Sequence, residues 1–483
     1  MGIIKKVFGA SAIIVLASGL TRLFTLLSAP VLTRLLGPAP YGTMALVGTA
    51  VAFASTLSLL GMDMSYARYY FSKENVTSHA VEQFCWRYTI FSSTGVGILA
   101  ALFWWYLFGR SMNNSLIALM VGLTSILFVA NTMSQTWARL RERYNQIGLA
   151  IIISGMVTVV ISMFLAIVWR RDEWSLLIGF AAGILINIVV IGTPKSNLLL
   201  KASGLTLKEK WPIIKLGLPG VITASMYWIL SSADRWFLKY FMGKEIVGIY
   251  SFAYSVAIVG QIVNTAIILT WIPESIRTYE ADTHGATSIL GEVWGGLALS
   301  LSLVWLIVAS IGGDIIRILA HSQFHSGAVY VPWIAGGVYF YGMSILATSG
   351  LLIAKNMKPA AGLWFMGGVL NVILNYFAIQ KWGAYGAAVV NCVSFGFIYF
   401  GVMWKSLKLF KLNLAWKKLF GVAVIVLMCG VVMSPAWHSY PLISICLKLP
   451  LCLGVSLCLS WLTVPGWVRQ IKVQLARIVG EKY

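Results

Sequence analysis

Residues 8–42 read FGASAIIVLASGLTRLFTLLSAPVLTRLLGPAPYG, an apolar run that ends in a turn rich in glycine and proline. The run is long enough to cross about 30 Å of hydrocarbon as one helix. Arg22 lies near its middle, with apolar residues on both sides. A permanent charge at this depth costs about 3 kcal/mol or more unless it faces water, protein or a counter-ion, and arginine cannot lose its proton. The stretch therefore predicts a helix that borders a polar, anion-attracting cavity; the alternative is an arginine paired structurally with another helix.

The composition places the whole chain in a membrane. Of its 483 residues, 59% are hydrophobic and 11% are charged, whereas soluble domains carry about 25% charged residues. Apolar runs of roughly 20 residues recur along the chain, and they lack the alternation of a membrane β-barrel strand. The expected fold class is an all-α polytopic membrane protein of about 14 transmembrane helices.

The apolar runs form groups of six, six and two, with basic linkers between the groups. The predicted spans are 8–33, 41–61, 85–108, 114–136, 147–169, 174–193, 212–233, 246–272, 289–312, 328–354, 360–380, 384–404, 419–434 and 441–463. We expect an N-lobe over 1–200, a C-lobe over 201–412, and the last two helices with a cytoplasmic tail over 413–483. No loop is long enough for a catalytic domain, and no G-x-x-x-x-G-K-[ST] phosphate-binding loop occurs.

The excess of basic residues indicates orientation in the membrane. The chain has 36 Lys and Arg against 15 Asp and Glu, a formal net charge of +21. In a soluble protein this excess would suggest nucleic acid binding, but here most of the basic residues fall in alternate short loops. The positive-inside rule places both termini in the cytoplasm, and no nucleic acid partner is expected.

Two turns predict an internal repeat. Gly37 and Gly42, between the first and second spans, have the same spacing as Gly243 and Gly248, between the seventh and eighth. Six spans separate the two turns, and because this number is even, both turns lie on the same face of the membrane. The sequence therefore predicts two parallel repeats related by an axis along the membrane normal.

Charged groups at the ends of two spans are candidate site residues. Asp63 and Arg68 follow the second span, where they form either a functional group or an ion pair at the membrane interface. Asp234 and Arg235 close the seventh span, and Lys239 lies one helical turn beyond. This second group is either the mouth of a cavity or a solvated helix end.

Two carboxamide pairs form a second set of candidates. Gln261 and Asn264 are three residues apart on the eighth span, and Asn371 and Asn375 are four apart on the eleventh. Each pair therefore shares one helix face. Carboxamides inside a membrane join helices to one another, and they would also suit the neutral hydrogen bonds that a sugar requires.

Four short motifs occur in order along the chain. Residues 34–42 read RLLGPAPYG, residues 61–70 read GMDMSYARYY, residues 232–235 read SADR ahead of VGIYSFAY at 247–254, and residues 371–376 read NVILNY ahead of GAYG at 383–386. In this order they resemble the signatures of bacterial polysaccharide exporters of the O-antigen flippase (Wzx) type. The resemblance covers nearly the whole chain.

This resemblance implies a fold, a substrate and a location. The fold is that of the multidrug/oligosaccharidyl-lipid/polysaccharide (MOP) exporters, two six-helix lobes around a central cavity, here with two extra helices. The substrate is an undecaprenyl-diphosphate-linked oligosaccharide, such as the O-antigen repeat unit of lipopolysaccharide, moved from the inner to the outer leaflet of the bacterial inner membrane. The expected partners are this glycan, the lipid bilayer and the polysaccharide polymerase and chain-length machinery. We expect no cofactor and no metal.

The candidate residues divide into three roles. We expect Arg22, with Arg235 and Lys239 at the outer mouth, to bind the diphosphate through charge-assisted hydrogen bonds. The four carboxamides would contact sugars while the lobes rock between two openings. The candidate coupling-ion or gating residues, for a proton or sodium gradient, are Asp63, Arg68 and Asp234.

Other functions remain as alternatives. A lipid II flippase or a MATE-type drug or cation antiporter would use the same fold, although a cationic drug favours acidic groups at depth and the mid-span charge here is basic. A scaffold for a glycan polymerase would tolerate substitutions in the cavity. A membrane glycosyltransferase would need an acidic cluster at an outer loop, which this sequence does not display. We therefore expect a transporter and not an enzyme.

Overall fold

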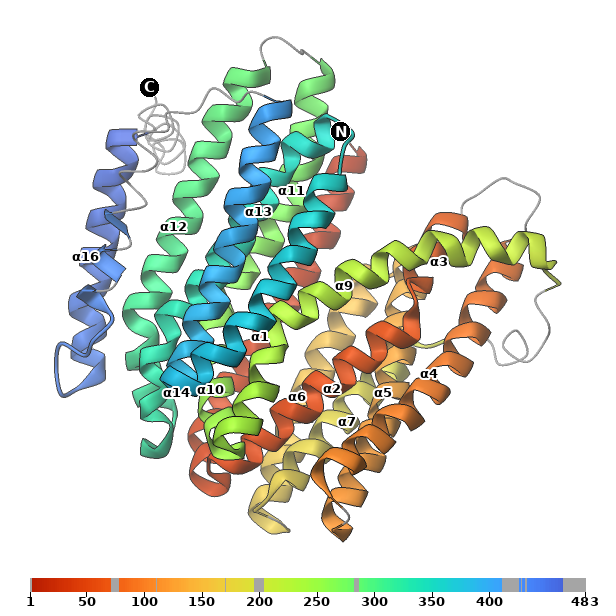
Figure 1. Cartoon of the computed structure of the whole chain (residues 1–483), viewed down its shortest axis with the longest axis horizontal. Coiled ribbons are helices and arrows are strands. Elements are labelled where there is room, and N and C mark those ends of the chain that lie inside the picture. The colour runs from red at the N-terminus through yellow and green to blue at the C-terminus, as the bar shows by residue number, and fades with distance from the viewer. Residues whose placement is uncertain are drawn as a thin grey trace. The chain divides into compact units, whose positions relative to one another are not determined.

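The structure is a computed structural model that describes residues 2–70, 78–109, 111–169, 171–194, 204–281, 286–410, 425–426, 428–430 and 432–463. The chain divides into two compact units, Met1–Gly248 and Ile249–Tyr483, each built from helices (Figure 1). Within the described residues there is no strand, and 11 helices are long and apolar enough to cross a membrane. The predicted all-α membrane fold class is confirmed.

The first unit contains the first seven predicted spans. They correspond to α1 (Gly2–Leu36), α2 (Pro38–Leu59), α4 (Ser78–Phe108), α5 (Met112–Leu140), α6 (Tyr144–Val168), α7 (Glu173–Ile191) and α9 (Leu207–Met242). A short helix, α3 (Met62–Tyr70), follows α2 and was not predicted. α1 packs against α6, α6 against α7, and α4 against α5, while α2 contacts α4, α5 and α9.

The second unit contains the remaining described spans. The eighth span is α10 (Lys244–Ala257), which starts at the end of the first unit, then a 3-10 turn, η1 (Ile258–Gly260), and α11 (Gln261–Ala281). The next elements are α12 (Ala286–Leu319), η2 (Ser322–Tyr330) and α13 (Val331–Ile353). α14 (Lys358–Leu409) holds the eleventh and twelfth spans, separated at Gly383 by a non-helical backbone with φ 57° and ψ −141°.

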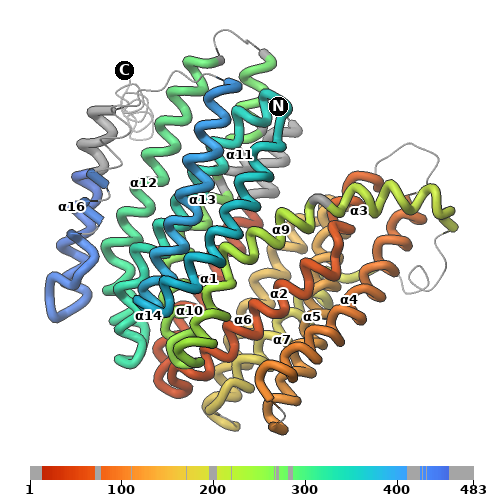
Figure 2. Tube along the Cα trace, in the orientation of Figure 1, coloured from red at the N-terminus to blue at the C-terminus, as the bar shows by residue number. Residues whose placement is uncertain are grey.

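The last helix of the described chain is α16 (Pro441–Thr463), which coincides with the fourteenth predicted span. It packs against α12, and α12 also packs against α13 (Figure 2). Half of the thirteenth predicted span, 419–434, and the whole of the C-terminal tail after Thr463 lie outside the described residues.

α9 packs within the first unit although it follows the basic linker. It contacts α2 and α3, and the hydroxyl of Ser65 on α3 donates a hydrogen bond of 2.7 Å to the carbonyl of Ile213 on α9. The lobe boundary near residue 200 stays a prediction.

The two turns of the predicted repeat have the same backbone conformation. Gly37 has φ 71° and ψ −177°, and Gly243 has φ 94° and ψ 175°. Only glycine adopts this region without strain. Each glycine ends one span and lets the next begin at once, which is why both turns need only a few residues.

The second glycine of each turn makes a reciprocal contact. A Cβ atom on Gly42 would collide with the carbonyl oxygen of Lys244, and one on Gly248 would collide with that of Pro38. Lys244 and Pro38 each precede the partner glycine by four residues, so the contact has two-fold character. This geometry, in which the two turns contact each other within the first unit, supports the predicted repeat.

Candidate functional site

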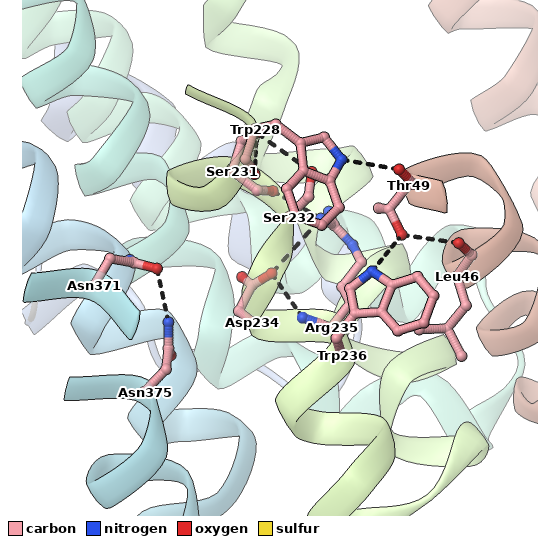
Figure 3. Close-up of polar contacts among 10 residues, drawn as sticks. All are labelled: Leu46, Thr49, Trp228, Ser231, Ser232, Asp234, Arg235, Trp236, Asn371 and Asn375. Atoms are coloured by element: carbon pink, nitrogen blue, oxygen red, sulfur yellow. Dashed lines mark hydrogen bonds and ion pairs between the residues drawn. The ribbon is translucent and has the colours of Figure 1, made fainter. Parts of the chain in front are cut away.

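A buried charged pair lies inside α9. Asp234 and Arg235 are 2% and 6% exposed, and the helix continues beyond them to Met242. The Nη1 of Arg235 lies 3.7 Å from Oδ1 of Asp234 and donates a hydrogen bond of 2.7 Å to the carbonyl of Ser231 (Figure 3). The two side chains are buried in the protein, and they lie before the end of α9. The pair is therefore not a solvated helix end.

Two indoles join α9 to α2 beside this pair. The Nε1–H of Trp228 donates to the carbonyl of Thr49 at 2.8 Å, and that of Trp236 donates to the hydroxyl of Thr49 at 3.1 Å (Figure 3). The Thr49 hydroxyl in turn donates to the carbonyl of Leu46 at 2.9 Å. Sequence reasoning missed these residues. The available signal was Trp228, which lies within the predicted span 212–233, where a buried indole N–H needs an acceptor; Trp236 lies beyond that span.

Replacing Thr49 with valine is expected to lower the free energy of unfolding by about 1–3 kcal/mol. Valine has nearly the same shape but no hydroxyl, so the Trp236 N–H loses its acceptor while Trp228 keeps the backbone carbonyl. Unfolding of the purified protein in detergent measures the loss. Thr94→Val on α4 is the control, because the Thr94 hydroxyl bonds only within its own exposed helix face. Equal stability of both variants would contradict the assigned role of Thr49.

Arg22 is half-buried on α1. Its charge interacts electrostatically with Tyr227 on α9, the residue that precedes Trp228. The hydroxyl of the neighbouring Thr21 donates between two carbonyls, that of Ala17 on α1 at 3.0 Å and that of Ile151 on α6 at 3.2 Å, so α1 contacts α6 closely at this level. The charge of Arg22 therefore acts on α9 at Tyr227, within the same unit.

Lys239 lies near the end of α9 against an aromatic ring. Its ammonium is 5.7 Å from the ring centre of Phe108 on α4, and that of Lys244 is 5.9 Å from the same ring. Phe108 also packs against Trp236, with ring centres 6.2 Å apart. Cation–π attraction therefore holds both ammonium groups against the Phe108 ring; one of the two, Lys244, was not predicted.

α3 lies beside an ion pair that the sequence did not reveal, with its Tyr70 ring centre 5.5 Å from the guanidinium of Arg141. Asp63 is half-buried and Arg68 is exposed. The nearby Glu82 on α4, 1% exposed, accepts a bond of 2.9 Å from Arg141 at the end of α5. Burial raises the pKa of Tyr66 on α3, so its hydroxyl stays protonated against this pair.

The carboxamides of the second unit bond to neighbouring protein groups. Asn264 donates to the carbonyl of Val338 at 2.8 Å and to the side chain of Gln261 at 3.3 Å. The cavity beside Asn264 has a volume of about 10 Å³, which suits one water molecule and no sugar.

The second carboxamide pair links the two halves of α14. Asn375 donates to Asn371 at 2.9 Å (Figure 3), and Asn371 donates to the hydroxyl of Ser394 at 3.2 Å. Asn371 and Asn375 are 2% and 0% exposed. The bond from Asn371 to Ser394 crosses the break at Gly383 and so holds the helical hairpin together, whereas the bond from Asn375 to Asn371 lies within the first half of α14.

The structure divides the candidates into two groups. The charged candidates lie in the first unit, with Arg22 on α1, Asp63 and Arg68 on α3, and Asp234, Arg235 and Lys239 on α9. The four carboxamides lie in the second unit. Arginine charges are permanent, so the first unit is suited chemically to an anion. Within the described residues, no group of three or more His, Cys, Asp or Glu could hold a metal ion.

Comparison with known proteins places the chain in a family and a fold. The model of a family described as "Polysaccharide biosynthesis protein" matches residues 9–279, more than half of the chain. The structure is similar to that of the lipid II flippase MurJ in an inward closed conformation, with a TM-score of 0.69, 16% sequence identity, and coverage of 92% of this chain and 97% of that one. Among curated proteins, none matches this chain.

Multidrug transporters also share the fold. An outward-facing MATE family transporter of the MOP superfamily has a TM-score of 0.52 and 12% identity, and a Vibrio cholerae MATE transporter has a TM-score of 0.52 and 11% identity; both comparisons cover 84% of this chain, and 95% and 97% of the respective transporters. These identities show the fold alone. The chain therefore belongs to the polysaccharide biosynthesis protein family and is a multi-pass membrane protein with the MOP exporter fold.

Proposed function

We propose that this protein is a flippase that moves an undecaprenyl-diphosphate-linked oligosaccharide from the inner to the outer leaflet of the bacterial inner membrane. The observation that carries the proposal is the set of permanent cations in apolar helices of the first unit, in a chain of the polysaccharide biosynthesis family. Arg22 is half-buried and Arg235 is buried. A diphosphate is the part of such a substrate that an apolar membrane excludes most strongly.

In this proposal the lipid tail stays in the bilayer while the diphosphate and the sugars pass through the protein. Arg22 binds the diphosphate first, and Arg235 and Lys239 bind it at the outer mouth. Arg235 is held by Asp234 and by the Ser231 carbonyl, so it is already oriented. The carboxamides contact sugars only if a rearrangement frees them, because Asn371 and Asn375 bond to each other.

Coupling and orientation belong to the same proposal. Asp63, Arg68 and Asp234 are the proposed gating or coupling-ion residues, driven by a proton or sodium gradient. Both termini are proposed to be cytoplasmic, and the O-antigen repeat unit for lipopolysaccharide is the proposed cargo, delivered to the polymerase and chain-length machinery. Asp234 is the best supported candidate for coupling among these three residues, since protonation or ion binding at its carboxylate would release Arg235.

The second candidate is a lipid II flippase, which the similarity of the whole fold to MurJ favours. Lipid II also carries a diphosphate on an undecaprenyl tail, so the same cations would serve it. A MATE-type drug or cation antiporter is the third reading. It is the least favoured because the buried carboxylate of Asp234 is paired with Arg235.

Transport by the purified protein in lipid vesicles tests these alternatives. Three substrates are compared: an undecaprenyl-diphosphate oligosaccharide, lipid II and a lipophilic cation, each with and without a proton or sodium gradient. We expect translocation of the oligosaccharide at least roughly tenfold faster than of the cation, as charge selection by a cationic site requires. Movement of lipid II alone would assign the second candidate, and movement of the cation alone would contradict the proposal.

A further inference from the structure

A buried ion pair joins α12 to α16 in the second unit. The Nζ of Lys448 on α16 lies 2.6 Å from Oδ2 of Asp314 on α12, and the two side chains are 0% and 1% exposed. Lys448 also donates a hydrogen bond of 3.0 Å to the carbonyl of Ser310, one turn earlier on α12. Lys448 is the one charged residue of α16, whereas α12 also carries Glu292 and Arg317. The two members of the pair are separated by 134 residues of sequence.

Neighbouring groups of the same chain complete this site. The hydroxyl of Ser444, one turn before Lys448, donates to Oδ2 of Asp314 at 3.0 Å. The backbone N–H of Trp437 donates to the Ser444 hydroxyl at 3.3 Å, and the Trp437 ring centre is 6.0 Å from the Lys448 ammonium. Arg317, about one third exposed, lies 3.7 Å from the other oxygen of Asp314. Oδ2 of Asp314 and the Lys448 ammonium are therefore bonded to groups on both helices, while Oδ1 of Asp314 accepts no hydrogen bond. The bonds of Oδ2 and Lys448 serve docking between helices.

α16 depends on this contact more than an ordinary apolar helix would. It carries Lys448 within its length and also Pro450, which interrupts the backbone hydrogen bonds of the helix. A lysine inside a membrane helix opposes insertion, unless a counter-charge or a carbonyl meets it. Asp314 and the Ser310 carbonyl supply both, and α12 is the packing partner of α16 (Figure 2).

We propose that Asp314 is the intramembrane receptor for Lys448, and that this pair allows α16 to insert and stay docked on α12. α12 precedes α16 in the chain, so the carboxylate is in place before the lysine is made. The pair lies beyond residues 9–279, the part that the family model matches. α16 is accordingly a helix whose insertion depends on a partner already in the membrane.

The orientation of a reporter fused after Tyr483 tests this dependence. A fluorescent protein reports a cytoplasmic end, and alkaline phosphatase reports an external one. In Asp314→Asn the lysine keeps its charge but loses its counter-ion, so we expect the fraction of chains with a misplaced end to rise roughly tenfold or more. In Lys448→Met the helix is apolar and needs no receptor, so its end stays where it is in the unsubstituted protein.

The double variant Asp314→Asn/Lys448→Met decides between docking and a general folding defect. We expect it to regain the orientation and the accumulation level of the unsubstituted protein, because neither charge is left alone. Glu292→Gln is the control, since it removes an exposed acid from the same helix, α12. Normal orientation of the C-terminal reporter in Asp314→Asn would overturn the proposal. So would a double variant as defective as Asp314→Asn. If Asp314→Asn fails to accumulate, the accumulation level of the double variant decides in the same way.

Discussion

Replacing Arg22 with alanine is expected to reduce glycan export by roughly 30- to 150-fold while the protein accumulates normally. The estimate corresponds to the loss of about 2–3 kcal/mol, a hydrogen bond to a charged group. Arg22 is half-buried on α1, and α1 is held on α6 by the neighbouring Thr21, so the helix keeps its anchor when the guanidinium is removed. Surface glycan on cells and translocation rates in vesicles both measure the effect.

Two further variants show what the guanidinium contributes. Arg22→Lys keeps the charge but loses the planar fork that bonds a phosphate through two nitrogens, so its export rate should fall between those of the unsubstituted protein and Arg22→Ala. Arg277→Ala on α11 is the matched control, because its side chain is 65% exposed and paired at the surface with Glu274. Export at the unsubstituted rate in Arg22→Ala would show that this arginine has no part in transport.

Replacing Gly42 with alanine is expected to destabilise the protein by about 3 kcal/mol or more. The added methyl group would collide with the carbonyl of Lys244. A backbone carbonyl in a helix cannot move to relieve this clash, whereas a flexible side chain could. Gly248→Ala should behave in the same way, since its methyl group would meet the carbonyl of Pro38. Unfolding in detergent and the amount of protein in the membrane measure both losses.

The same helix provides the control for this prediction. Gly48 on α2 has no atom within 4 Å of the position where a Cβ would lie. Gly48→Ala should therefore be neutral or stabilising by up to about 1 kcal/mol, the gain in helix propensity. If Gly42→Ala were as stable as Gly48→Ala, the two turns would not be in close contact. The two-fold contact between Gly42 and Gly248 would then be contradicted.

Hydropathy predicted most of the fold because it acts locally. A bilayer requires about 20 apolar residues per helix whatever the neighbours are, so the first twelve predicted spans each coincide with helix in the structure. The boundaries differ where the helix continues past the hydrocarbon. α9 runs from Leu207 to Met242 rather than over 212–233, which moves Asp234 and Arg235 from the expected end of a helix into its interior.

The candidate site was less accessible to sequence reasoning. The positions of Arg22, Arg235 and Lys239 on their helices follow from the sequence, as does the spacing of Asn371 and Asn375. The partners do not follow, because a hydrogen bond between helices depends on how the helices rotate and pack. Thr49 bonds to two indoles that lie 179 and 187 residues further along the sequence.

By itself, the sequence determined that this chain spans a membrane many times and repeats a glycine turn, because hydrophobicity and backbone conformation are properties of short segments. Tertiary structure alone decided which buried charges meet, as in Glu82 with Arg141 and Asp314 with Lys448. An isolated charge in an apolar helix is costly wherever it lies, so its presence can be read from the chain. The group that neutralises it is selected by distance in space, and only the packed helices set that distance.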